Sequence, residues 1–322
     1  MSRVVLIDGH SLLFRAYHAL PKTFRTKEGK PGGAVYGFLT MLIRVVDDLK
    51  PDFLAVGFDE SAATLRHSQL LTYKEGRPEM EDDLKSQQPI VREILESFKI
   101  PVFSLPGYEG EDILATLVAK LTTHNSQLTT KENLEFYIVS GDRDVAQLVN
   151  SQVRFYMPKK GLSQAVIYDE KNVGEVFGVK ANQVTDFKGL RGDSSDKIPG
   201  VYGIGDKTAV ALIKKFGSVE SVYKNLRKVK EEFGSVVESK LIEGAEQAVM
   251  SKRIAQIMDD VPISVEPEKL KFEGFLQKEG LDYLRSLGFR SILKRLGYAL
   301  EIKEKKGLKG KAEALMDQIS LF

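Results

Sequence analysis

The chain has 322 residues, of which 42% are hydrophobic and 29% charged, and its formal net charge is only +2. This hydrophobic content can form the core of one large domain or of two intimate ones. The sequence has no cysteine, which excludes disulfides, thiolate zinc sites and iron–sulfur clusters. No run approaches the ~18 consecutive apolar residues of a membrane span, and the first apolar run is too short for a signal peptide. We therefore expect a cytoplasmic protein without membrane contact.

Residues 1–180 alternate between strand-like and helix-like segments. Helical spacing of apolar residues predicts helices at 33–49 and 111–123. This alternation is typical of an α/β fold with a parallel sheet and helices on both faces. Short apolar runs rich in Val, Ile and Phe predict the buried strands, at 3–7, 53–58, 101–105 and 134–140.

A polar insertion at about 61–95 interrupts this alternation and carries Arg66, Lys74 and Arg77. Insertions this long inside a compact domain are usually functional or disordered. From the residues alone, the alternative that Lys74 and Arg77 lie on a solvated helix face is favoured, because exposed charged faces are common.

The remainder of the chain changes character. Residues 181–260 are predicted to be helical with glycine-marked loops, 261–302 to return to the core, and 303–322 to form a flexible tail. Between residues 197 and 230 there are eight basic and two acidic residues, a local charge of +6. Such a segregation of charge suits a protein that holds cations in one place and phosphates in another.

Acidic residues follow the predicted strands and open one predicted helix. Ligands of open parallel sheets bind outside the carboxyl ends of the strands, so we expect these acids to meet at one edge. Taken alone, Asp8 or Asp142 is weak evidence for a metal site, since an Asp after a strand is often a helix cap. Capping is a poor explanation for acids that follow several strands and open a helix as well. The candidate metal ligands are Asp8, Asp59, Glu109, Glu111, Asp112, Asp142, Asp144, Asp193 and Asp196.

A cluster of oxygen ligands without His or Cys suits a hard ion, Mg²⁺ or Mn²⁺. Two such ions about 4 Å apart can clamp the attacking and leaving oxygens of a phosphodiester displacement. Asp-x-Asp after a strand also occurs in aspartyl-phosphate enzymes, so this motif alone is not specific. The four histidines are scattered, and we assign them no catalytic role.

A set of motifs in chain order resembles the 5′-nuclease domain found at the N-terminus of bacterial DNA polymerase I. The resemblance identifies the chain as a member of the 5′-3′ exonuclease and flap endonuclease family. It covers about residues 3 to 298, nearly the whole chain. The motifs are VLIDGHS at 5–11, AVYGF at 34–38, GFD at 57–59, YKxxR at 73–77, PGYEGED at 106–112, GDRD at 141–144, GDSSDKIPG at 192–200 and GIGxKTA at 203–209.

This resemblance implies a PIN-like core, a helical arch over the active site formed by the insertion at about 61–95, and a helix–hairpin–helix subdomain at 181–260. It implies a structure-specific nuclease that uses two metal ions to remove RNA primers or flaps in DNA replication and repair. The implied substrate is nicked, flapped or 5′-ended duplex DNA, cut by a monomer. Position 111 is Glu where the bacterial domain usually has Asp, which leaves the spacing of the ions open.

The resemblance also implies roles for basic and aromatic residues. Lys74 and Arg77 would grip the scissile phosphate as catalytic residues, and fixed cations are most useful where charge develops. Arg66 and Lys188 are further candidates for DNA contacts. Tyr73, or alternatively Tyr36, would stack on a terminal base.

Residues 200–208 resemble a helix–hairpin–helix turn, which binds DNA phosphates through its backbone. The glycines do not follow a strand, which argues against a dinucleotide site; the alternative is a simple turn before a soluble helix. The resemblance implies K⁺ on the backbone carbonyls, with Thr208 nearby. The candidate DNA contacts here are Gly203, Gly205, Lys207, Thr208, Lys214 and Lys215.

The final residues, QISLF, resemble the peptide by which bacterial replication proteins bind the β sliding clamp. Gln318 would form hydrogen bonds, while Leu321 and Phe322 would fill an apolar pocket. The alternative is a terminal amphipathic segment that packs on the domain. For the whole chain, the alternative functions are a catalytically silent module that binds branched DNA, or a related metal-dependent ribonuclease or phosphatase.

Overall fold

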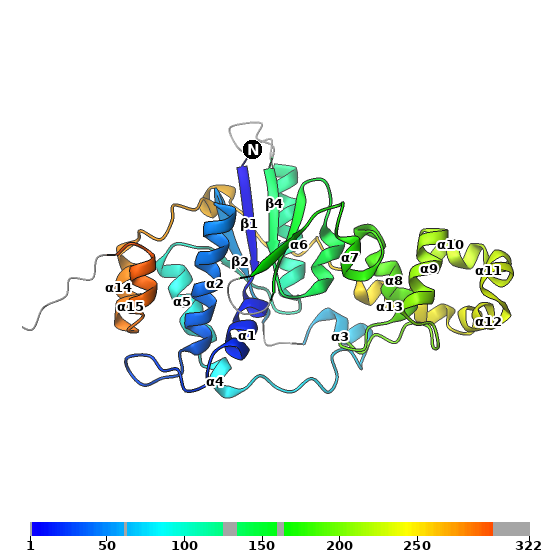
Figure 1. The fold of residues 1–322 in the computed structure, drawn as a ribbon, viewed down its shortest axis with the longest axis horizontal. Coiled ribbons are helices and arrows are strands. Elements are labelled where there is room, and N and C mark those ends of the chain that lie inside the picture. Colours follow the sequence, from blue (N-terminus) through cyan, green and yellow to red (C-terminus); the bar gives the residue numbers. More distant parts are fainter. Residues whose placement is uncertain (1, 61–62, 125–133, 160–163, 299–322) are drawn as a thin grey trace, which may run out of the picture.

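The computed structural model describes residues 2–60, 63–124, 134–159 and 164–298. A six-stranded sheet in the order β3-β2-β1-β4-β5-β6 forms the centre of the molecule (Figure 1). All neighbouring strands are parallel except β5 and β6. The strands are β1 Ser2–Asp8, β2 Phe53–Gly57, β3 Val102–Phe103, β4 Leu134–Val139, β5 Val153–Pro158 and β6 Ala165–Tyr168.

The predicted α/β core is confirmed, with two differences. The strand expected at 101–105 is reduced to two residues, and strands β5 and β6 were not predicted. Both β5 and β6 lie on one side of the sheet, where β6 is an antiparallel edge strand. Edge strands are covered on fewer sides than central ones, so their apolar pattern is weaker.

Alternate residues of β1 face opposite cores because side chains alternate along a strand. Val5 and Ile7 belong to a core under α1 Gly9–Ala19, α2 Gly33–Leu49 and α5 Gln88–Ser97. Val4 and Leu6 belong to the core on the other face, which α6 Gly110–His124 covers. The predicted helices at 33–49 and 111–123 are therefore confirmed.

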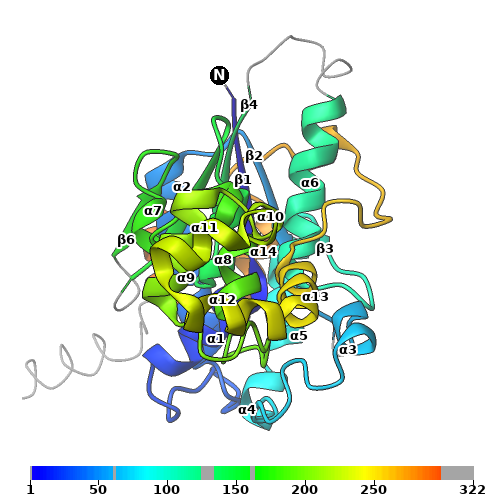
Figure 2. The same cartoon turned by 90° about the vertical axis from the view of Figure 1, so that its right-hand side faces the viewer.

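The segment around 61–95 is only partly an insertion. It contains α3 Leu65–Gln69 and α4 Asp82–Lys85, but Val91, Ile94 and Leu95 of α5 are buried in the main core. The polar stretch therefore ends before α5, because the apolar face of α5 packs into the main core. Figure 2 shows α3 and α4 beyond the end of the sheet at which β1 enters α1.

A helical lobe, whose own core contains buried residues from Val179 to Ala248, extends from one side of the sheet (Figure 1). Helices α14 and α15 return to pack on α5 and α2 at the other end of the molecule. No helix among the described residues is long and apolar enough to cross a membrane. The remaining helices are α7 Gly174–Phe177, α8 Val184–Arg191, α9 Asp206–Phe216, α10 Val219–Lys224, α11 Leu226–Phe233, α12 Ser235–Glu243, α13 Ala245–Ala255, α14 Lys278–Ser286 and α15 Arg290–Arg295, with 3₁₀ turns at Arg143–Leu148, Ala181–Gln183 and Pro267–Leu270.

Candidate active site

The strand order predicts where on the sheet a ligand would bind. After β1 the chain forms β2 on one side, and later β4 on the other, so the connections diverge at β1. Such a switch point leaves a crevice at the carboxyl ends of the strands. Asp8 is the last residue of β1 and lies opposite Gly57 of β2, two residues before Asp59. Asp142 follows β4 by three residues, so the topology delivers all three carboxylates to this edge.

Asp8 and Asp142 also cap the helices that follow them. Asp8 accepts hydrogen bonds from the Ser11 amide, at 2.9 Å, and from the Ser140 hydroxyl, at 2.7 Å. Asp142 accepts one from the Asp144 amide at 2.9 Å. The capping alternative is therefore correct for both residues, but it does not exclude a ligand role, because a carboxylate has about four lone-pair sites.

Two hollows meet at this edge and share Arg77, Gly141 and Asp142. The first, of about 980 Å³, is lined by five of the predicted acids together with Lys74 and one face of α1. The second, of about 730 Å³, lies between the core and the helical lobe. It is lined by Asp144 of the core and by Lys188 and other residues of the lobe. The five acids of the first hollow are Asp8, Asp59, Glu109, Glu111 and Asp142.

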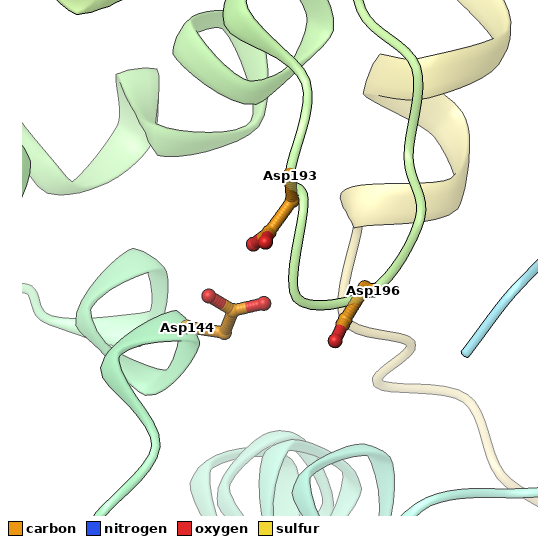
Figure 3. Close-up of side chains that lie close together, drawn as sticks. All are labelled: Asp144, Asp193 and Asp196. Atoms are coloured by element: carbon orange, nitrogen blue, oxygen red, sulfur yellow. The ribbon is translucent and has the colours of Figure 1, made fainter. Parts of the chain in front are cut away.

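Three of the acids form a tight group (Figure 3). One carboxylate oxygen from each of Asp144, Asp193 and Asp196 lies within 4.8 Å of the other two. Asp144 comes from the turn after β4, and the other two from the loop after α8, so the core and the helical lobe both contribute. Oxygen ligands at this spacing are suited to one hard divalent ion.

Three carboxylates of the site bind their protons more tightly than such groups usually do. Burial and the neighbouring Asp59 raise the pKa of Asp8 to about 7. Burial raises the pKa of Asp144 to about 7 as well, although a nearby lysine opposes the shift. Burial and acidic neighbours raise the pKa of Glu111 well above its usual value. Crowded, desolvated carboxylates take up protons unless a cation balances them, so the site is complementary to cations.

Asp112 differs from the other acids in its surroundings, and its role as a metal ligand stays a prediction. Its side chain is fully buried, and its two oxygens accept hydrogen bonds from Arg66 at 2.7 and 2.8 Å. The amides of Glu109 and Met258 donate to the same oxygens at 3.1 and 2.8 Å. These four donors saturate the carboxylate, so in this structure Asp112 anchors the start of α6.

The DNA contacts predicted for Arg66, Tyr73 and Lys188 stay predictions, and in this structure the three residues have other partners. All three side chains are buried, and each contacts carboxylates of the site. Arg66 binds Asp112, and the Tyr73 hydroxyl donates to Glu109 at 3.2 Å. The alternative stacking residue, Tyr36, packs edge-on against Phe289 with its hydroxyl 2.9 Å from Ser291.

Lys74 and Arg77 both pair with acids at this edge of the sheet, which we call the acidic rim. The Lys74 ammonium donates to Glu109 at 2.7 Å, and Arg77 forms an ion pair with Asp196. Backbone contacts fix this part of the arch, because the Lys74 amide donates to the Asp196 carbonyl at 3.0 Å. Neither residue lies in a helix, and the Arg77 side chain is still 48% exposed, so their catalytic roles stay predictions.

Helix α1 contributes residues that our sequence reasoning did not single out. Ser11, Phe14, Arg15 and His18 line the first hollow at helical spacing, and His10 joins them. Within the described residues, the buried His10 Nδ1 and Arg15 Nε atoms have no hydrogen-bond partner, while the Phe14 side chain is 51% exposed. A signal was present: Ser11, Phe14, Arg15 and His18 follow a candidate ligand at i, i+3, i+4 and i+7, the spacing of one helix face.

The hairpin forms as predicted, with Gly203 at φ +78° and Gly205 as the residue before α9. Lys207 and Lys214 are exposed, whereas the Lys215 ammonium forms an ion pair with Glu232 at 3.0 Å. Thr208 is half-buried in the first turn of the helix. The Lys240 ammonium donates to the Gly203 carbonyl at 3.1 Å, so a cation of the chain already lies at the hairpin.

The predicted clamp-binding residues, Gln318, Leu321 and Phe322, lie outside the described residues. Nothing in the geometry of the site bears on them, and they stay a prediction.

Comparison with known proteins matches both parts of the chain. The protein-family model of the 5′-3′ exonuclease N-terminal resolvase-like domain matches residues 3–178. The family model of the 5′-3′ exonuclease C-terminal SAM fold matches residues 179–278. DNA polymerase I of Bacillus subtilis is 39% identical over 295 residues, which cover 92% of this chain and 32% of that protein. DNA polymerase I of Mycobacterium tuberculosis H37Rv is 34% identical over 294 residues, 91% of this chain and 31% of that protein.

Solved structures show the same fold. The phage T5 5′-exonuclease with bound divalent metal ions (zinc) has a TM-score of 0.61 at 20% identity, covering 91% of this chain and 96% of that one. The catalytic core of Rad2 in complex with a DNA substrate has a TM-score of 0.57 at 15% identity, covering 92% of each chain. Because the family models match most of the sequence, the chain belongs to the 5′-3′ exonuclease family of nucleases.

Proposed function

We propose that this chain is a structure-specific 5′-3′ exonuclease and flap endonuclease that hydrolyses DNA phosphodiesters with Mg²⁺, or with Mn²⁺ in its place. One observation carries the proposal: carboxylates from the core and the helical lobe meet at a single rim, beside the arch cations Lys74 and Arg77. Because the chain spans only 32% of the length of its Bacillus relative, a role in primer removal, replication and repair belongs to this proposal. So do the cytoplasmic setting and the monomeric state.

The acids of the rim fit divalent ions. All of them offer oxygen, and burial raises the pKa values of Asp8, Asp144 and Glu111, which supports a site that would gain from a bound cation. We assign one ion to Asp144, Asp193 and Asp196. A second is assigned to the first hollow, with Asp8, Asp59, Glu111 and Asp142 as its ligands.

When bound, two divalent ions lower the pKa of a water nucleophile and balance the charge on the leaving oxygen. The residues of the chain then have to position the substrate. We assign Lys74 and Arg77 to the non-bridging oxygens of the scissile phosphate, because both line the first hollow next to the acids. Each must exchange its present carboxylate partner for the phosphate. Electrostatic stabilisation of this kind acts most strongly in a site that excludes water.

The face of α1 opposite the arch completes the proposed substrate pocket. The Arg15 guanidinium, whose Nε has no partner among the described residues, is assigned to a neighbouring phosphate. The exposed Phe14 ring is assigned to stacking on a base near the 5′ end.

The helical lobe is proposed to hold the duplex without reading its sequence. Lys207 and Lys214 are exposed at the hairpin and its following helix, where cations and a helix N-terminus suit phosphates. A K⁺ ion at the hairpin carbonyls stays part of the proposal. Its support is that the Gly203 carbonyl already attracts the Lys240 ammonium.

The decisive experiment uses a labelled 5′-flap substrate with Mg²⁺, with chelator, and with Asp142→Asn. The amide keeps a capping oxygen but removes the charge, so the fold should persist. We expect roughly a thousandfold or greater loss of cleavage, the scale of losing several kcal/mol of charge stabilisation, with duplex binding nearly unchanged. Asp282→Asn, an exposed acid paired with Arg285, is the matched control and should cleave normally.

The same assay distinguishes the main alternative, a catalytically silent module that binds branched DNA. Tight binding of the flap substrate by the wild-type chain without cleavage in Mg²⁺ or Mn²⁺ would establish that alternative. Full activity of Asp142→Asn would show that the metal assignment is wrong.

A further inference from the structure

The acids of the rim fall into two groups according to their partners. Within the described part of the chain, no lysine, arginine or histidine nitrogen lies within 4.0 Å of the carboxylates of Asp8, Asp59 or Asp142. The group of Asp144, Asp193 and Asp196 is different, because each member forms an ion pair with a side chain of the protein.

Lys188 supplies two of these pairs from α8. Its side chain is 2% exposed, and its ammonium forms ion pairs with Asp144 and, at 2.6 Å, with Asp193. One oxygen of each of these aspartates belongs to the tight group that suits a divalent ion. The ammonium and the ion would therefore compete for the same two carboxylates.

The pairing is buried, so solvent screens it little. An ion that enters the group must therefore displace the ammonium from both carboxylates.

We propose that Lys188 is a built-in competitor for the divalent ion at Asp144, Asp193 and Asp196. The inference rests on the proposed function. It makes the two ions unequal. Among the described residues, three of the four ligands of the first-hollow ion have no cationic partner, and the fourth, Glu111, lies 4.0 Å from Arg66. The other ion must displace an ammonium that touches two of its three ligands. The second ion is therefore the weaker one, and Lys188 sets the concentration at which it binds.

The test is calorimetric titration of the full chain with Mn²⁺ in the absence of DNA, so that cleavage is not the readout. Wild type should show a tight and a weak binding event. Lys188→Met should tighten the weak event by about tenfold or more, the factor set by losing one charge-assisted hydrogen bond, and leave the tight event nearly unchanged. Lys188→Arg keeps the competing charge and should keep the weak event weak.

Arg191→Met is the matched control for charge. Arg191 lines the second hollow, as Lys188 does, but pairs with Asp206 at 2.9 Å, outside the group of Asp144, Asp193 and Asp196. Equal tightening by Arg191→Met and Lys188→Met would overturn the proposal, because general charge would then explain the effect. An unchanged or weaker second event in Lys188→Met would also overturn it.

The outcomes separate this inference from the proposed function. If neither wild type nor any variant binds Mn²⁺, both are wrong. If wild type binds two ions and Lys188→Met binds them with the same affinities, only the role of Lys188 is wrong. Circular dichroism verifies folding; should Lys188→Met not fold, Lys188→Gln, which also removes the charge, replaces it with the same expected result.

Discussion

Asp112 and its neighbour Glu111 lie side by side in one acidic motif yet have opposite surroundings. Asp112 is held by Arg66 and two backbone amides, whereas Glu111 lines the first hollow and has a raised pKa. Helix geometry separates them, since adjacent residues on a helix point about 100° apart. One acid of the motif thus serves the fold, and the other faces the proposed metal site.

Arg66→Met should destabilise the protein by about 3–5 kcal/mol, because it leaves Asp112 charged and buried without its partner. Urea denaturation measures the change in the free energy of unfolding. Arg227→Met removes an arginine whose side chain is 92% exposed and pairs with Glu231, and should change stability by less than about 0.5 kcal/mol. Similar stabilities for the two variants would contradict the anchoring role of Arg66.

At the scale of elements, the arch is tied to both the core and the helical lobe. The Leu65 amide donates to the Gly107 carbonyl at 2.9 Å, and Tyr73 packs with Ile198 and Ile254 in a small buried cluster. These contacts hold Lys74 over the first hollow, so the arch cation is positioned by packing rather than by its short helices.

Lys74→Ala should slow the chemical step by about a hundredfold or more, the usual effect of removing one group that stabilises developing charge. Binding of the flap substrate should weaken much less. Single-turnover rates with enzyme in excess measure the step directly. Lys85→Ala, at an exposed arch lysine that pairs with Glu79 and Asp82, should leave the rate unchanged; an unchanged rate for Lys74→Ala would refute its role.

Across the whole molecule, charges of opposite sign are separated in space although the net charge is only +2. The acids gather at the end of the sheet, while exposed lysines such as Lys207 and Lys214 lie on the helical lobe beside it. A duplex held by the lobe would bring one strand to the rim, and ionic attraction of this kind depends on salt.

Lys207→Ala and Lys214→Ala should each reduce the slope of log affinity against log salt by about 0.9, the value of one phosphate contact. Fluorescence anisotropy with a nicked duplex at several salt concentrations measures the slope. Lys294→Ala, on α15 at the opposite end of the molecule, is the control and should not change it. A slope that responds equally to all three variants would argue against the lobe as the DNA-binding surface.

Deletion of residues 318–322 should leave cleavage of naked DNA unchanged and remove binding to a β sliding clamp, because the peptide resembles a clamp-binding sequence. A pulldown with purified clamp checks the second part. Persistent clamp binding by the shortened chain would show that the tail is not the attachment point.

The sequence by itself determined the α/β core, the positions of its central strands and the acids that follow them. This was possible because buried parallel strands are short apolar runs, and because their carboxyl ends share one edge of the sheet whatever the details of packing. Ordered motifs also sufficed to predict the nuclease family. The start of α5 was missed because local patterns are weakest at the boundaries between elements. The edge strand β6 was missed because an edge strand is covered on fewer sides and has a weaker apolar pattern.

Only the tertiary structure decided how the charged residues are paired. Arg66 and Asp112 are 46 residues apart, and Lys188 and Asp144 are 44 apart, so no local spacing relates them. Whether a carboxylate meets a cation, a proton or an open hollow depends on which distant segments pack against it. Burial then fixes the outcome, since an unpaired charge costs far more inside a protein than in water.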